Sequence, residues 1–137
     1  MQEEEKAENL YRHKMFYGSS GSSFSYNERL HKNSDFKKIF EHGVRLSVGF
    51  ANIFIFNRKD GKPIKRLGLV TSKKVGIAVE RNKAKRRIRE IFRTGKNKLV
   101  DGLDIIFVLK SSIKFQKYSF IEQKIFDTLK SAGYCKE

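Results

Sequence analysis

The sequence predicts a single α+β domain, and two observations support this fold class. The first is size: 137 residues with 39% hydrophobic side chains, including twelve phenylalanines, suffice for one modest core. The second is periodicity, which changes along the chain in the order helix, two or more strands, helix, strand, helix.

Residues 1–27 are predicted to be a flexible extension that precedes a folded domain at residues 28–137. The extension holds three basic and four acidic side chains, and its segment GSSGSS has the composition of a flexible linker. The whole chain has a formal net charge of +15, so the residues after the extension carry +16. Such an excess favours a polyanionic partner. Nucleic acid is the leading class, and an anionic membrane or an acidic protein is the alternative.

The folded part is predicted to begin with a helix within residues 33–43. Asn33 or Ser34 can cap its start, and Gly43 is suited to end it. The apolar residues at helical spacing are Phe36, Ile39 and Phe40. The next segment, 50–57, has strand composition, and its alternation separates two sides. One side carries Phe50, Asn52, Phe54 and Phe56, and the other carries Ala51, Ile53 and Ile55.

Three further elements follow a turn at residues 58–65. Residues 66–72, RLGLVTS, are predicted to form a second strand. The apolar run 103–110, LDIIFVLK, predicts a central strand because apolar residues fill both of its sides. The last helix is predicted within residues 118–133. Ser119 and Glu122 form a capping box, Gly133 ends the helix, and the buried stripe is Ile121, Ile125 and Leu129.

Residues 81–94, RNKAKRRIREIFRT, predict an amphipathic helix with a strongly basic outer side. The core-facing arc carries Ala84, Ile88, Ile91 and Phe92. Like charges follow one another at successive i+4 steps, at Arg81, Lys85, Arg89 and Arg93. Only Glu80 and Glu90 can offset this repulsion, so a merely solvated helix is the weaker alternative. A phosphate backbone would neutralise the charge and match the guanidinium groups.

The sequence shows no set of residues for catalysis or metal binding by the protein itself. Carboxylates after residue 27 are scattered singly, and His13, His31 and His42 are not paired. The single cysteine, Cys135, excludes an internal disulfide, and zinc-ligand spacing is absent. Because no membrane span or signal peptide is visible either, we expect a cytoplasmic chain without a membrane partner.

The segment SKKVGIAVERNKAKRRIREIFR resembles the signature of the bacterial ribonuclease P protein family. That family has SKK-x-G, a short spacer, and R-N-R-x-K-R-x-x-R on a helix. The matching positions here are Ser72, Lys73, Lys74, Gly76, Arg81, Asn82, Lys85, Arg86 and Arg89. The single departure is Lys83, which stands where arginine is usual and lacks the bidentate fork. RLHKNSDFKKIFEHG, RLG and GLDIIFV also resemble family segments, so the likeness covers residues 29–134.

The resemblance implies both a fold and a function. Members of the family fold as a sandwich of three helices on a four-stranded sheet, with a left-handed βαβ crossover through the signature helix. The function implied is that of the accessory protein subunit of ribonuclease P, which removes the 5′ leader from precursor tRNA. The catalyst is a large RNA that binds the Mg²⁺ ions. One protein per RNA is expected to bind that RNA and the single-stranded leader, and to raise the affinity for substrate and Mg²⁺.

The resemblance also assigns site residues, none of them catalytic and none a metal ligand. Those expected to face the RNA subunit are Arg81, Asn82, Lys85, Arg86 and Arg89. Those expected in the leader-binding cleft are Phe36, Phe40, Lys73 and Lys74, with Phe54 or Phe56 opposite the helix. Two alternatives stay open, because phenylalanines at helical spacing often belong to the core and Asn82 can simply contact the start of its own helix.

Two other classes of function compete with this interpretation. A ribosomal protein or a general RNA chaperone would have the same composition, and only the ordered signature separates it from the ribonuclease P family. A basic module that binds membranes or proteins would leave bulky apolar residues of the helix exposed. Ile88 and Phe92 are instead needed for the core.

Overall fold

The computed structural model of the chain describes residues 25–137. Most of the predicted extension, residues 1–24, lies outside the described residues. The helices are α2 (Asn33–His42), α3 (Ala78–Gly95) and α4 (Tyr118–Ser131). The strands are β1 (Val44–Ser47), β2 (Ala51–Asn57), β3 (Arg66–Val70) and β4 (Leu103–Leu109). Short 3₁₀ turns connect them: η1 (Tyr26–Glu28), η2 (Lys73–Val75), η3 (Lys96–Lys98) and η4 (Ser111–Phe115).

The four strands form one mixed sheet in the order β1-β2-β4-β3. β2 pairs antiparallel with β1 and with β4, whereas β3 pairs parallel with β4. The predicted central strand β4 therefore has a partner on each side, which confirms its position. Helix α3 connects the parallel neighbours β3 and β4, so the expected βαβ crossover is present. Its left-handedness stays a prediction from the resemblance.

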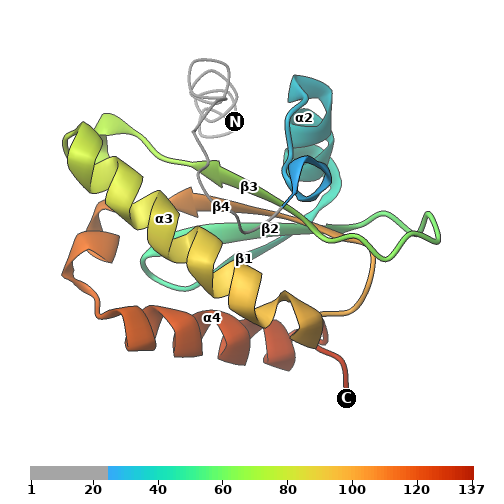
Figure 1. The fold of residues 1–137 in the computed structure, drawn as a ribbon. Helices are drawn as coiled ribbons and strands as arrows, with labels where there is room; N and C mark the ends of the chain where they lie inside the picture. Colours follow the sequence, from blue (N-terminus) through green and yellow to red (C-terminus); the bar gives the residue numbers. More distant parts are fainter. Residues whose placement is uncertain (1–24) are drawn as a thin grey trace.

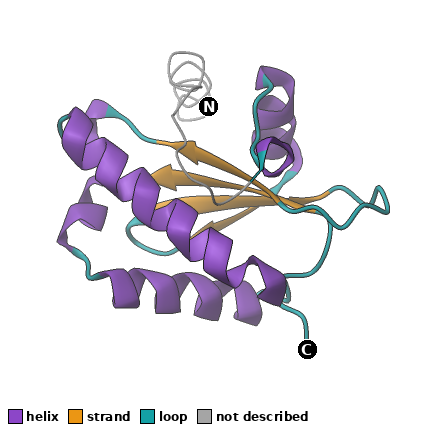
Figure 2. Cartoon of the chain, in the orientation of Figure 1, coloured by secondary structure: helices purple, strands orange, loops and turns teal. Residues whose placement is uncertain are grey.

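Helices cover both faces of the sheet (Figures 1 and 2). Helices α3 and α4 lie on one face, where they enclose the larger core with the odd-numbered residues of β4 and β2, such as Ile105 and Ile53. Helix α2 lies on the other face over a smaller, aromatic cluster. The predicted α+β class, with three helices on a four-stranded sheet, is thus confirmed, and the helices are divided between the two faces.

The alternation within β2 explains this division. Ile53 and Ile55 belong to the larger core, whereas Phe54 belongs to the α2 cluster and Phe56 packs against it. Phe50 departs from the prediction, because it precedes the strand and packs into the larger core. A residue outside the pleat is no longer bound by the period of two.

Helix ends were the weakest part of the sequence prediction. Neither α2 nor α4 has a side-chain cap, because their N-cap residues are Lys32 and Lys117. The predicted caps at Asn33 and Ser34 and the Ser119–Glu122 box are therefore wrong. Helix α3 begins at Ala78, three residues before the predicted start, and its first turn is closed by Glu80, whose carboxylate accepts the Ile77 N–H at 3.1 Å.

Two glycines that were predicted to end helices behave differently. Gly133 has φ of 89°, and the N–H groups of Gly133 and Tyr134 donate to carbonyls of the last turn of α4, as predicted. Gly43 has φ of −79°, so it is not the left-handed residue that the prediction required. It is needed for space, because a Cβ there would lie 2.6 Å from the Ile39 carbonyl oxygen and 2.9 Å from that of Ile55.

Candidate functional site

Helix α3 presents a buried side and a charged outer side, as its periodicity predicts. Ala84, Ile88 and the other two predicted core residues, Ile91 and Phe92, are all buried against the sheet. The outer side exposes Asn82, Lys83, Arg86 and Arg93. Because apolar packing fixes the helix from beneath, the exposed side chains hold a defined orientation relative to the sheet.

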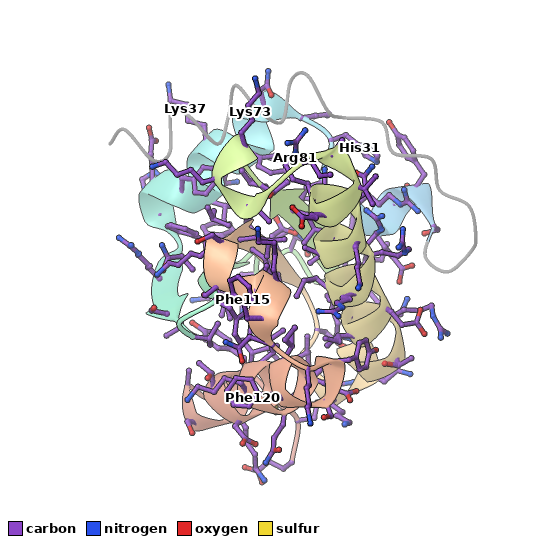
Figure 3. All side chains as sticks on the ribbon, turned by 90° about the vertical axis from the view of Figure 1, so that its left-hand side faces the viewer. His31, Lys37, Lys73, Arg81, Phe115 and Phe120 are labelled. Atoms are coloured by element: carbon purple, nitrogen blue, oxygen red, sulfur yellow. The ribbon has the colours of Figure 1, made fainter. Side chains whose placement is uncertain are left out.

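The loop before α3 sets the first charges of this surface. The Ser72 hydroxyl oxygen accepts the Lys74 N–H at 3.2 Å, which closes the η2 turn around the buried Val75. Arg81 reaches back and donates through Nη1 to the carbonyl oxygen of Gly76 at 2.8 Å. Lys73 and Arg81 therefore lie at the same end of the molecule (Figure 3), and Lys73 and Lys74 are both exposed.

The five residues expected to face an RNA subunit differ in exposure. Asn82 and Arg86 are exposed, and Arg81 and Arg89 are half-buried. Lys85 is only 2% exposed, so it does not belong to the accessible surface. Its place in the helical arc is next to the core residues, and tertiary packing closes over it. The sequence periodicity alone could not reveal this, because position 85 lies at the border between the two arcs.

The two carboxylates of α3 pair with cations other than Arg86. Glu90 pairs with Arg93, which holds the pKa of the Glu90 carboxyl below its ordinary value. Glu80 lies 3.6 Å from the Lys114 ammonium nitrogen, on the side that faces η4. Within the described residues, Arg86 has neither a hydrogen bond nor an ion pair. Its guanidinium is therefore available to an anionic partner.

The phenylalanines expected in a leader-binding cleft lie on the α2 side of the sheet. Phe36, Phe40 and Phe54 are 0%, 7% and 3% exposed, and the rings of Phe40 and Phe54 meet edge to face at 4.9 Å between centroids. These three rings form the core of the small cluster, which was the alternative left open by the sequence. Phe56 is half-buried, and the Lys38 ammonium lies 5.1 Å from its ring centroid.

The sheet register separates Phe56 from the two lysines. Phe56 lies opposite Asp104, which lies opposite Arg66 at the start of β3. Lys73 and Lys74 follow the other end of β3, beyond Val70. Four steps along β3 span roughly 13 Å at about 3.3 Å each, so Phe56 and the lysines lie toward opposite ends of the sheet.

A buried carboxylate on the same face escaped the sequence analysis. Asp104, 2% exposed, accepts from Arg58 Nη1 at 2.8 Å and from Arg66 Nε and Nη2 at 2.8 and 2.7 Å. The hydrogen bond from Arg66 to Asp104 raises the pKa of the Arg66 guanidinium above its ordinary value. Asp104 interrupts the apolar run LDIIFVLK, and that interruption was the available signal. Its role is structural, because both of its carboxylate oxygens accept hydrogen bonds from the two arginines.

A family model described as Ribonuclease P matches residues 24–133 of the chain. The chain belongs to the ribonuclease P protein family. Membership makes it a subunit of the ribonuclease P ribonucleoprotein, which processes tRNA. Its partner is the ribonuclease P RNA. The signature suggested by the sequence is thus confirmed at the level of the family.

Relatives match over nearly their whole length. The ribonuclease P protein component of Thermotoga maritima is 38% identical over 112 residues, which cover 79% of this chain and 94% of that protein. The component of Clostridium novyi is 32% identical over 107 residues, covering 78% and 95%. Among solved structures, the Staphylococcus aureus RNase P protein superposes with a TM-score of 0.70 at 33% identity, covering 80% of this chain and 98% of that one. The T. maritima RNase P protein gives 0.66 at 33% identity, covering 76% and 96%.

Residues 25–137 contain neither a candidate metal site nor a candidate membrane span. No cluster of three or more histidine, cysteine, aspartate or glutamate side chains in this part of the chain could hold a metal ion. None of the described helices is long and apolar enough to cross a membrane.

Proposed function

We propose that the chain is the accessory subunit that binds the catalytic RNA of ribonuclease P through the outer side of α3. The observation that carries this proposal is the exposed Asn82–Arg86 surface, flanked by Arg81 and Arg89, while both helix carboxylates are paired with other cations. Guanidinium groups bind phosphate oxygens bidentately, and each neutralised phosphate releases counterions. Asn82 supplies a neutral amide that can hydrogen-bond to RNA.

The single-stranded 5′ leader of precursor tRNA is proposed to bind on the α2 side of the sheet. The groups accessible to it are Phe56 with Lys38 above its ring, and Lys73 and Lys74 toward the other end. Phe36, Phe40 and Phe54 then act as the floor that fixes α2 on the sheet. Stacking and phosphate contacts of this kind bind single strands with little sequence preference.

Mg²⁺ is proposed to be bound mainly by the RNA subunit, where it supports the cleavage chemistry. The protein contributes positive charge beside the phosphates of RNA and substrate, which lowers the repulsion that Mg²⁺ otherwise has to screen. The expected consequence is a lower Mg²⁺ requirement of the assembled enzyme.

Reconstitution tests the proposal directly. A bacterial ribonuclease P RNA is mixed with precursor tRNA at low Mg²⁺, with and without this protein, and 5′-leader cleavage is followed. Cleavage that needs both components supports the accessory role. Cleavage by the protein alone would overturn the assignment of catalysis to the RNA. Binding to RNA without any rescue of cleavage would favour a general RNA-binding protein.

Variants separate the two proposed surfaces. Asn82→Ala should weaken assembly with the RNA subunit, whereas Lys124→Ala, at an exposed position of α4, is the matched control. Phe56→Ala should weaken the binding of a precursor with a long leader and leave a precursor with a minimal leader unaffected. An equal loss with both precursors would remove Phe56 from the leader site.

A further inference from the structure

Two exposed aromatic rings belong to η4 and α4, on the face of the sheet opposite α2. Phe115, at the end of η4, is 79% exposed, and Phe120, in the first turns of α4, is 47% exposed. Figure 3 shows both rings on the side of the molecule that also carries Lys73 and Arg81. Exposing a phenylalanine forgoes the gain of burying it, so two neighbouring exposed rings mark a contact surface.

Both rings are held by a rigid base. The η4 turn is anchored by Ile113, which is fully buried, and by Arg87 of α3, which donates to the carbonyl oxygen of Gln116 at 3.2 Å. Phe120 packs edge to face on the buried Phe50, with 6.3 Å between ring centroids. A ring that is already fixed loses little conformational entropy when a partner stacks on its free face.

The chemistry around the rings is cationic. The Lys114 ammonium lies 5.7 Å from the centroid of the Phe115 ring. Lys114 also lines a pocket of about 100 Å³ between η4 and α3, together with Lys83, Arg87 and Glu80. The Glu80 carboxylate faces Lys114 and accepts the Ile77 N–H. The pocket lining therefore carries three positive charges and one negative charge, and the negative charge is already paired. This excess of positive charge suits a phosphate group beside an aromatic ring.

We propose that the surface formed by Lys114, Phe115 and Phe120 binds an unpaired segment of RNA, with a base stacked on Phe115 and a phosphate at the pocket lined by Lys83, Arg87 and Lys114. Interleaved rings and lysines are the general means of holding single strands. The centre of a protein–protein interface is depleted of lysine, whereas here Lys114 borders the Phe115 ring. This contact goes beyond the proposed function, since it adds a third RNA surface, at η4 and the start of α4, beside the proposed α3 surface.

The absence of tryptophan from the sequence permits a site-specific test. Phe115→Trp introduces a single tryptophan whose emission a stacked base quenches. The full chain is titrated with a single-stranded oligouridylate and with an oligomer of equal length that lacks bases. Quenching by the oligouridylate alone is expected. Equal response to both oligomers, response to neither, or quenching only by vesicles of anionic phospholipid would each overturn the proposal.

Control variants test whether the oligomer contacts Phe115, and added RNAs identify the molecule that supplies the unpaired segment. Val44→Trp, at an exposed position of β1, should show no quenching. In the Phe115→Trp background, Lys114→Gln should weaken oligomer binding severalfold, whereas Lys62→Gln, in the turn between β2 and β3, should leave it unchanged. Quenching on addition of ribonuclease P RNA assigns the segment to the RNA subunit, and quenching only after precursor tRNA assigns it to the substrate. Quenching by neither RNA overturns the proposal, even where leader cleavage is rescued and the proposed function stands.

Discussion

The two aromatic groups of this protein have opposite surroundings. Phe36, Phe40 and Phe54 lie between α2 and the sheet with at most 7% of their surface exposed, whereas Phe115 is 79% exposed on η4. The first group has the helical and strand spacing that draws attention in a sequence, and the second group has no periodic signature. Spacing in the sequence therefore identified a cluster of aromatic rings, but it did not show which rings are exposed to solvent. Exposure depends on what the rest of the chain packs against them.

The largest expected effect concerns the buried group. Phe36→Ala should lower the free energy of unfolding by about 3–5 kcal/mol, because the cavity cannot be filled by its neighbours. Phe36 fits against Gly68, where a Cβ would lie 2.7 Å from its ring. Urea unfolding measures the change. Phe115→Ala is the comparison, with an expected loss within about 0.5 kcal/mol. Similar losses for both variants would contradict the difference between the two groups.

The second expected effect concerns whether the aromatic cluster alone stabilises the packing of α2 on the sheet. Asp104→Asn should cost roughly 3 kcal/mol in stability, since Arg58 and Arg66 lose a buried carboxylate partner. Asp60→Asn removes the other carboxylate that contacts Arg58, at an exposed position, and should cost much less stability than Asp104→Asn. If Asp104→Asn were neutral, the stability of this face would come from the aromatic cluster alone.

The third effect concerns binding and should leave stability unchanged. Arg86→Ala removes an exposed guanidinium, so unfolding should shift by less than about 0.5 kcal/mol. Binding to ribonuclease P RNA should weaken. The slope of log K against log salt should become smaller in magnitude by about one, because one phosphate contact is lost. Salt titrations of the Arg86→Ala and Lys124→Ala variants measure this. A matched loss of thermal stability would indicate that Arg86 supports the fold.

The smallest effect concerns the segment before α2. Although partial burial acts in the other direction, the Lys96 ammonium and the Ser25 N–H hold the pKa of the Glu28 carboxyl below its ordinary value. The pair with Lys96 therefore adds stability above the pKa of unfolded glutamate, about 4.3, and this contribution is lost as the pH falls through the lower folded value. Glu28→Gln should cost less than about 1 kcal/mol at pH 7 and nothing in strong acid. The free energies of unfolding of the unmodified protein and of Glu28→Gln are compared between pH 7 and pH 3. A difference in stability that does not change with pH would contradict the prediction.

The sequence predicted the main helix well and its ends poorly. Ala84, Ile88, Ile91 and Phe92 are buried as expected, because amphipathic periodicity directly reflects burial of one face. Strand β1 was not recognised, since its four residues, VRLS, are too few to show alternation. The caps were misplaced because a polar residue near a helix start can cap it, but tertiary contacts decide where the helix begins.

The sequence by itself determined the fold class, the basic side of α3 and the family, because these rest on periodicity, charge and an ordered set of residues. Tertiary structure alone decided which of these residues meet solvent. Lys85 is covered although it belongs to the signature, and Phe115 is exposed although it is apolar. The physical reason is that burial is a property of packed surfaces contributed by distant segments. Local periodicity reports only the side of an element on which a residue lies.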